Sequence, residues 1–144
     1  MTPQTRAEKC AALMWANDAA SQKLGMSLDA IAPGSATLSM PVRDEMLNGL
    51  GMCHGGMIFT LADSALAFAS NSYNVLMVAQ QVQITYVAPA KAQEMLTATA
   101  CEIVRTGRSG TYDVTITGKD GHKIALLRGL TRSVKGQHFD EDPE

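Results

Sequence analysis

One charged side chain interrupts an otherwise apolar stretch. The segment 57–71, MIFTLADSALAFASN, contains neither glycine nor proline, and its single charge is Asp63. Thr60, Asp63 and Ser64 are spaced i, i+3 and i+4, so on a helix they share one face. A buried carboxylate is costly unless it is paired, hydrogen-bonded or used, and burial raises its pKa towards the range of acid–base catalysis. Asp63 is therefore either a catalytic carboxylate or a structural one held by backbone amides or an arginine.

A histidine and two glycines, His54-Gly55-Gly56, stand directly before this segment. The first four amides of a helix have no partner within the helix, and glycine allows a ligand to approach the backbone closely. A helix N-terminus also favours negative charge, such as an oxyanion developing on an ester or thioester carbonyl. The alternative is that the glycines serve only the turn and its packing.

The spacing of Gly55 and Asp63 indicates whether the two residues can act in one site of a single subunit. Gly55 and Asp63 are eight residues apart, which is roughly 12 Å along a helix at about 1.5 Å per residue. One reacting carbon cannot lie about 3 Å from both groups. If both serve one reaction, they must come from different subunits, and the site must lie at a dimer interface.

Other candidates surround this pair. Asn48 can orient the loop or hydrogen-bond the nucleophile or water, or it can simply form a turn. Cys53 and His54 are adjacent in a loop, which disfavours a thiol nucleophile paired with a base. Neither His122 nor His138 adds metal-ligand spacing to these two residues, so we expect no metal and no cofactor.

Basic residues near predicted turns are candidates for phosphate contacts. Arg105, Arg108 and Ser109 flank or lie in the turn TGRSG at 106–110, and Lys91 lies in an earlier loop. Arginine suits the phosphates of a nucleotide tail, although basic turn residues are more often simply solvated. The whole chain carries 12 Lys+Arg against 14 Asp+Glu, which excludes a strongly basic surface for nucleic acid.

Hydrophobic periodicity predicts the elements that position these residues. Residues 5–24 read as a helix, 43–56 as a glycine-rich loop, and 57–71 as a buried central helix. Alternating apolar residues predict five strands, at 35–42, 78–88, 94–105, 111–117 and 123–134. Turn signals at 106–110 and 118–121 predict hairpins. The α+β fold that follows is an antiparallel sheet wrapped around one long helix.

Length and composition limit the number of domains and the class of protein. The chain has 144 residues, 46% of them hydrophobic and 18% charged, as expected for one folded domain over 1–134. The acidic tail 135–144 has no apolar pattern and is expected to be disordered. No 18-residue apolar window or signal-peptide core is seen, so we expect no membrane partner. Three scattered cysteines are typical of a reduced, cytoplasmic protein.

A family resemblance covers residues 10–134. The chain resembles the hotdog-fold acyl-CoA thioesterases, and within them the phenylacetic acid degradation branch. The residues that carry the resemblance are Asn48-Gly49, Cys53-His54-Gly55-Gly56, Leu61-Ala62-Asp63, Ala67 and Asn71, with further likeness at Asn17-Asp18-Ala19, Leu24-Gly25, 96–100, 110–113 and 127–129.

The resemblance implies an enzyme that hydrolyses aryl- or arylacetyl-CoA, such as phenylacetyl-CoA or its hydroxylated forms, to free acid and coenzyme A. Its fold would be a hotdog fold, paired into homodimers and then homotetramers with sites between subunits. The Gly55 amide would polarise the thioester carbonyl, and Asp63 of the partner subunit would be the nucleophile or general base. Asn48 would orient the reacting group and His54 would shape the loop. Gly56, Ser64 and the basic turns would contact the substrate or its coenzyme A arm, and coenzyme A would be part of the substrate.

One departure and three alternatives remain open. Many relatives carry Ser or Thr near the start of the strand after the helix, where this chain reads Ala79-Gln80-Gln81. Other medium or long acyl-CoAs are alternative substrates, and a non-enzymatic acyl-CoA-binding module is an alternative function. A dehydratase acting on acyl carrier protein is disfavoured, since the buried helix has no histidine.

Overall fold

A 16-residue helix, α3 (Gly55–Ser70), forms the centre of the molecule. The structure, a computed structural model, describes residues 1–142. Half of α3 is buried because apolar residues lie on nearly every face; its buried residues are Ile58, Leu61, Ala62, Ala65, Leu66, Phe68, Ala69 and Ser70. The predicted buried central helix is therefore confirmed, with a start two residues earlier than expected.

Side chains fix both ends of α3. At the N-terminus, the amide of Gly56 donates to His54 Nδ1 at 2.9 Å, so the histidine caps the helix. At the C-terminus, Asn71 Nδ2 donates to the carbonyls of Ala67 and Met77, and its Oδ1 accepts from the amide of Met77. Asn71 thus ties the end of the helix to the beginning of the next strand.

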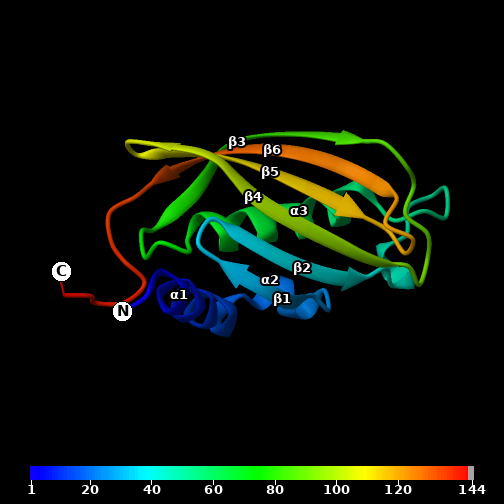
Figure 1. The fold of residues 1–144 in the computed structure, drawn as a ribbon. Helices are drawn as coiled ribbons and strands as arrows, with labels where there is room; N and C mark the ends of the chain where they lie inside the picture. Colours follow the sequence, from blue (N-terminus) through cyan, green and yellow to red (C-terminus); the bar gives the residue numbers. More distant parts are fainter. Residues whose placement is uncertain (143–144) are drawn as a thin grey trace.

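Six strands form one antiparallel sheet that curls around α3 (Figure 1). They are β1 (Ser27–Ala32), β2 (Ser35–Pro41), β3 (Met77–Tyr86), β4 (Met95–Thr106), β5 (Ser109–Thr117) and β6 (Lys123–Ser133). The order across the sheet is β1-β2-β4-β5-β6-β3. The five predicted strands and both predicted hairpins are confirmed. The third strand does not pair with its successor; it pairs with β6 and forms the far edge.

The concave face of the sheet supplies the other half of the core. Leu96, Ala98 and Ala100 on β4 alternate with more exposed residues, and their backbones pair with β2. Tyr112 and Val114 are buried on β5 in the same way. Alternate side chains of a strand point to opposite faces, so these residues pack on the apolar surface of α3.

The N-terminal region differs from the prediction in two respects. The expected helix 5–24 is divided into α1 (Pro3–Asn17) and α2 (Ala19–Lys23). Asp18 lies outside helical conformation, and its carboxylate caps α2 by accepting from the amide of Ser21 at 3.0 Å. Strand β1 was not predicted, because a bulge after Leu28 disrupts its pairing with β2 and its burial does not alternate. Gly34, with φ +72°, makes the turn between these strands.

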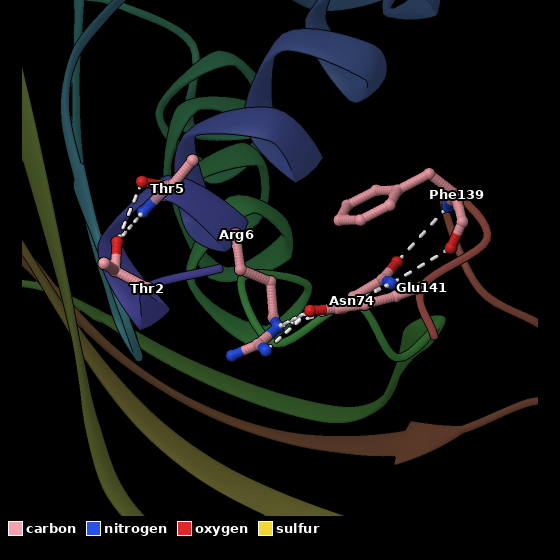
Figure 2. A network of polar contacts seen from close by, with 6 residues as sticks. All are labelled: Thr2, Thr5, Arg6, Asn74, Phe139 and Glu141. Carbon is pink, nitrogen blue, oxygen red and sulfur yellow. Dashed lines mark hydrogen bonds and ion pairs between the residues drawn. The ribbon is translucent and has the colours of Figure 1, made fainter. Parts of the chain in front are cut away.

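The tail expected to be disordered is placed against the fold as far as residue 142; residues 143–144 lie outside the described residues. Figure 2 shows the contacts of Arg6 with Glu141 and of Asn74 with Phe139. Arg6 on α1 makes an ion pair with Glu141, with a closest approach of 2.6 Å. Asn74 Oδ1 accepts from the amides of His138 and Phe139, and its Nδ2 donates to the carbonyl of Phe139. Asn74 is buried and has a left-handed backbone conformation, with φ 60°. Its side chain therefore supplies the hydrogen bonds that hold the backbone of the tail.

Across residues 1–142, no helix is long and apolar enough to cross a membrane.

Candidate active site

Asp63 lies half-buried on α3 beside a cavity of about 240 Å³. The other residues that line this cavity are Leu66, Ala67, Ser70, Met77, Val78, Ala79 and Thr131. Burial raises the pKa of Asp63. Among the described residues, no hydrogen bond or ion pair holds its carboxylate. The structural alternative, a carboxylate held by backbone amides or an arginine, therefore finds no support in the structure.

Gly55 opens a second and larger cavity, of about 390 Å³, at the N-terminus of α3. Its lining is mainly apolar and comprises Met52, Cys53, Gly55, Ile58, Tyr86, Val87, Ala88, Pro89 and Ala90. Gly55 is the first residue of the helix, so its amide has no acceptor within α3. No acceptor elsewhere in residues 1–142 takes this donor. The amide is thus available to an oxygen atom of a ligand.

The two cavities share no lining residue. Within one chain, the Asp63 carboxylate and the Gly55 amide therefore lie at different cavities. This agrees with their separation of eight residues along the helix. The edge strand β3 connects them. Its first residues, from Met77 to Ala79, line the Asp63 cavity, and its last residue, Tyr86, lines the Gly55 cavity.

Tyr86 was not singled out by the sequence. Its hydroxyl donates to the carbonyl oxygen of Gly55 at 2.8 Å. The two residues are 31 positions apart, and only the pairing of β3 with β6 brings them together. The sequence holds no local signal for this contact beyond a tyrosine in a predicted strand.

Two loop residues hold the N-terminus of α3. Asn48 Oδ1 accepts from the amides of Leu50 and Met52, at 2.9 and 3.2 Å, so Asn48 is a turn-forming residue. Its Nδ2 has no partner among the described residues and remains available as a donor. His54 caps the helix and thereby shapes the loop, as the resemblance implied.

The remaining polar residues of α3 make local bonds. Thr60 donates back to the carbonyl of Gly56. Ser64 Oγ lies 2.8 Å from Ser21 Oγ, whose own hydroxyl donates to Asp18. Ser64 therefore joins α3 to α2 and does not line the Asp63 cavity. A substrate contact through Ser64 or Gly56 stays a prediction.

The four candidate coenzyme A residues do not form one group within the chain. Lys91 is exposed and follows Ala90 of the Gly55 cavity. Arg105 lies at the far end of the 12-residue strand β4, roughly 33 Å along the strand from Met95 at about 3.3 Å per residue. There its guanidinium stacks on Tyr73, 3.6 Å from the ring centre. Arg108 is exposed in the adjoining turn, and Ser109 begins β5. Their contacts with coenzyme A stay predictions.

At the start of β3, this chain has Ala79-Gln80-Gln81 where many relatives carry Ser or Thr, and the structure shows where these residues lie. Ala79 lines the Asp63 cavity and brings no hydroxyl, and a bulge in the pairing with β6 falls at Gln80. Gln81 lines a different hollow, together with Gln83 and Arg128. The buried Thr131 on β6 also lines the Asp63 cavity, and its hydroxyl donates to the carbonyl of Gly110 at 3.3 Å.

Comparisons of the sequence and of the structure with known proteins all match thioesterases or esterases. Residues 50–125 match the thioesterase superfamily. The chain is 37% identical over 123 residues to acyl-coenzyme A thioesterase PaaI of Escherichia coli (strain K12), covering 85% of this chain and 88% of that protein. It is 37% identical over 121 residues to a putative esterase of Archaeoglobus fulgidus, covering 84% and 79%. The solved structure of E. coli PaaI, from the phenylacetic acid degradation operon, matches with a TM-score of 0.93 at 35% identity, covering 94% of this chain and 99% of that chain.

The chain belongs to the thioesterase superfamily, and it has the hotdog fold of that family's acyl-CoA thioesterases.

Proposed function

We propose that this protein hydrolyses aryl- or arylacetyl-CoA thioesters, with phenylacetyl-CoA and its hydroxylated forms as the leading substrates. The observation that carries the proposal is a half-buried carboxylate, Asp63, that faces a cavity without a partner in the described chain. The substrate class is supported by the 37% identity to the E. coli thioesterase of phenylacetic acid degradation. The apolar lining of the Gly55 cavity, with Tyr86 as its aromatic residue, suits an aryl group.

In the proposed reaction, the Gly55 amide donates to the thioester carbonyl oxygen and stabilises the negative charge that develops there. Asp63 of the partner subunit attacks the carbonyl carbon, or takes a proton from the water that does. The carbon–sulfur bond breaks, and the thiolate of coenzyme A leaves and is protonated. Where water attacked, this step gives the free acid directly. Where Asp63 attacked, the acyl group is left on its carboxylate as a mixed anhydride, which a water molecule hydrolyses to release the acid and restore Asp63. Asn48 Nδ2 is placed in the loop to orient the reacting group. Water is the second substrate, and the reaction as proposed uses no metal or further cofactor.

The proposed reaction needs a dimer, and the position of β3 at the edge of the sheet favours one. This ten-residue strand ends the sheet, so one of its edges presents backbone groups without a sheet partner. We propose that two copies pair through antiparallel β3 strands about a two-fold axis near Gln81 and Val82. Such pairing sets Tyr86 of one copy beside Met77 of the partner subunit. The Gly55 cavity of one copy then adjoins the Asp63 cavity of the other.

We further propose that two such dimers form a homotetramer in the cytoplasm, with no nucleic acid or membrane as partner. Three free cysteines support a reducing compartment.

Thiol release from a panel of acyl-CoAs tests the proposal. The panel comprises phenylacetyl, hydroxyphenylacetyl, benzoyl, short-chain and long-chain thioesters, each with the native chain and Asp63→Asn. Fast release from arylacetyl-CoA that the variant loses is the expected result. Release confined to aliphatic chains would contradict the substrate class. Binding without any release would indicate an acyl-CoA-binding module instead.

A further inference from the structure

Tyr86 contacts Gly55 in two separate ways. The phenol donates to the Gly55 carbonyl at 2.8 Å. The ring also covers the α-carbon, since a Cβ added at Gly55 would lie 3.1 Å from Cζ and 3.2 Å from the hydroxyl oxygen of Tyr86. A side chain at position 55 would therefore crowd the tyrosine ring, whereas glycine, which has none, fits.

The peptide between Gly55 and Gly56 is held at both ends. Tyr86 binds its carbonyl oxygen, and its amide donates to His54 Nδ1 at 2.9 Å. With this plane fixed and the ring against the α-carbon, little freedom remains for the preceding peptide, which carries the free Gly55 amide. The direction of that donor is thus set by a side chain outside the loop and the helix.

The tyrosine is itself well supported. It ends β3, and its backbone is paired with Ala125 near the start of the neighbouring strand β6. Burial raises the pKa of Tyr86, so its hydroxyl stays protonated and remains a donor at neutral pH. Both contacts therefore persist under the conditions in which the enzyme would work.

We propose that Tyr86 is a positioning residue that aims the Gly55 amide at the thioester carbonyl, through its hydroxyl bond to the Gly55 carbonyl and its ring packing on the α-carbon. The inference deepens the proposed function and rests on it. An oxyanion donor stabilises the transition state only when it points at the position of the developing charge. Tyr86 touches no reacting atom in this account; it acts through Gly55.

The first test removes one oxygen atom. Tyr86→Phe keeps the ring against Gly55 and loses the hydrogen bond, so kcat for phenylacetyl-CoA should fall by about 10-fold while KM stays within about twofold. The acid limb of the pH profile should not move, since Asp63 is unchanged. The matched control is Tyr73→Phe, which removes a hydroxyl bonded to Glu102 at the other end of α3 and should keep native kcat. An unchanged kcat in Tyr86→Phe would overturn the proposal.

The second test needs no turnover. Two unreactive analogues of phenylacetyl-CoA are compared by calorimetry: a ketone, with CH₂ in place of sulfur, and a thioether without the carbonyl. Tyr86→Phe should weaken binding of the ketone by several-fold and leave the thioether unchanged. Equal effects on both analogues, or no preference for the ketone in the native chain, would overturn the positioning role. A native chain that binds the ketone but releases no thiol would overturn the proposed hydrolysis alone.

Discussion

At the scale of single residues, the proposed reaction depends on the carboxylate of Asp63. Replacing it with asparagine keeps the shape and removes the base or nucleophile, so kcat should fall by about 100-fold or more. Thiol release from phenylacetyl-CoA measures this loss, and native-like turnover would contradict it.

Stability distinguishes this loss from unfolding. Because burial raises the pKa of Asp63, the folded chain binds that proton more readily than the unfolded chain, and the charged form destabilises the fold. Asp63→Asn should therefore be at least as stable as the native chain at pH 7. Any gain should fade as the pH falls towards the ordinary aspartate pKa of about 3.9.

The same raised pKa predicts the pH dependence of activity. Asp63 must be ionised to act, so kcat/KM should decline on acidification with an apparent pKa above the ordinary value of about 3.9. A pH profile from 4 to 8 in the native chain checks this. A kcat/KM that stays level down to pH 4 would contradict the role of the carboxylate.

Sequence reasoning found Asp63, Gly55 and His54 because each stands out locally: a lone charge in an apolar helix and a glycine pair at its start. It missed Tyr86 and Thr131, because sheet pairing alone brings them to the cavities. Ser64 shared a helical face with Asp63, yet its hydroxyl bonds Ser21 in α2. Spacing along a helix indicates a shared face, but it does not say which neighbour covers that face.

At the scale of elements, Asn71 joins the end of α3, the start of β3 and the tail. It is 3% exposed, bonds Ala67 and Met77, and lies 2.8 Å from His138 Nε2. Asn71→Ala would leave these buried groups unsatisfied and should lower the free energy of unfolding by about 1–3 kcal/mol. Asn17→Ala, at an exposed helix end, is the control and should cost less. Equal denaturant midpoints for the two variants would contradict the claim.

The tail acts as a second tie between elements. A guanidinium–carboxylate pair joins Arg6 on α1 to Glu141, and the hydrogen bond from Arg6 lowers the pKa of Glu141. A lowered carboxylate pKa contributes stability above the ordinary glutamate value of about 4.3, and this contribution is lost on further acidification. Glu141→Gln should thus lower Tm at pH 7, with the difference shrinking below pH 4. Identical Tm values at pH 7 would show that the tail does not stabilise α1.

The elements themselves were largely predictable from periodicity, because alternating or helical burial leaves a pattern in the sequence. Strand β1 left none: it carries a bulge and lies at an edge with little buried surface. The break at Asp18 was hidden inside a segment of helical spacing. The acidic tail has no apolar pattern, yet specific bonds from Asn74 and Arg6 hold it.

At the scale of the whole molecule, one chain holds two separate cavities, which the proposed reaction treats as two half-sites. The Gly55 cavity and the Asp63 cavity lie at opposite ends of β3, and that strand has a free edge. Antiparallel pairing of two such edges would create two equivalent sites, each with an amide from one copy and a carboxylate from the other. The spacing of Gly55 and Asp63 along one helix predicts a site between two subunits on the condition that both groups serve one reaction.

Complementation between two inactive variants tests the shared site most directly. Asp63→Asn removes the carboxylate. Gly55→Pro removes the amide donor at the first helical position, where the helix backbone tolerates proline. Its Cβ would lie 3.1 Å from Cζ of Tyr86, so the tyrosine ring must shift, and circular dichroism checks that this variant folds. Co-refolded in equal amounts, half of the dimers should be mixed, and each mixed dimer should hold one intact site. Thiol release should then recover to about one quarter of the native rate. Mixed dimers that form, as shown by two affinity tags, but remain inactive would place both groups in one chain and contradict the account.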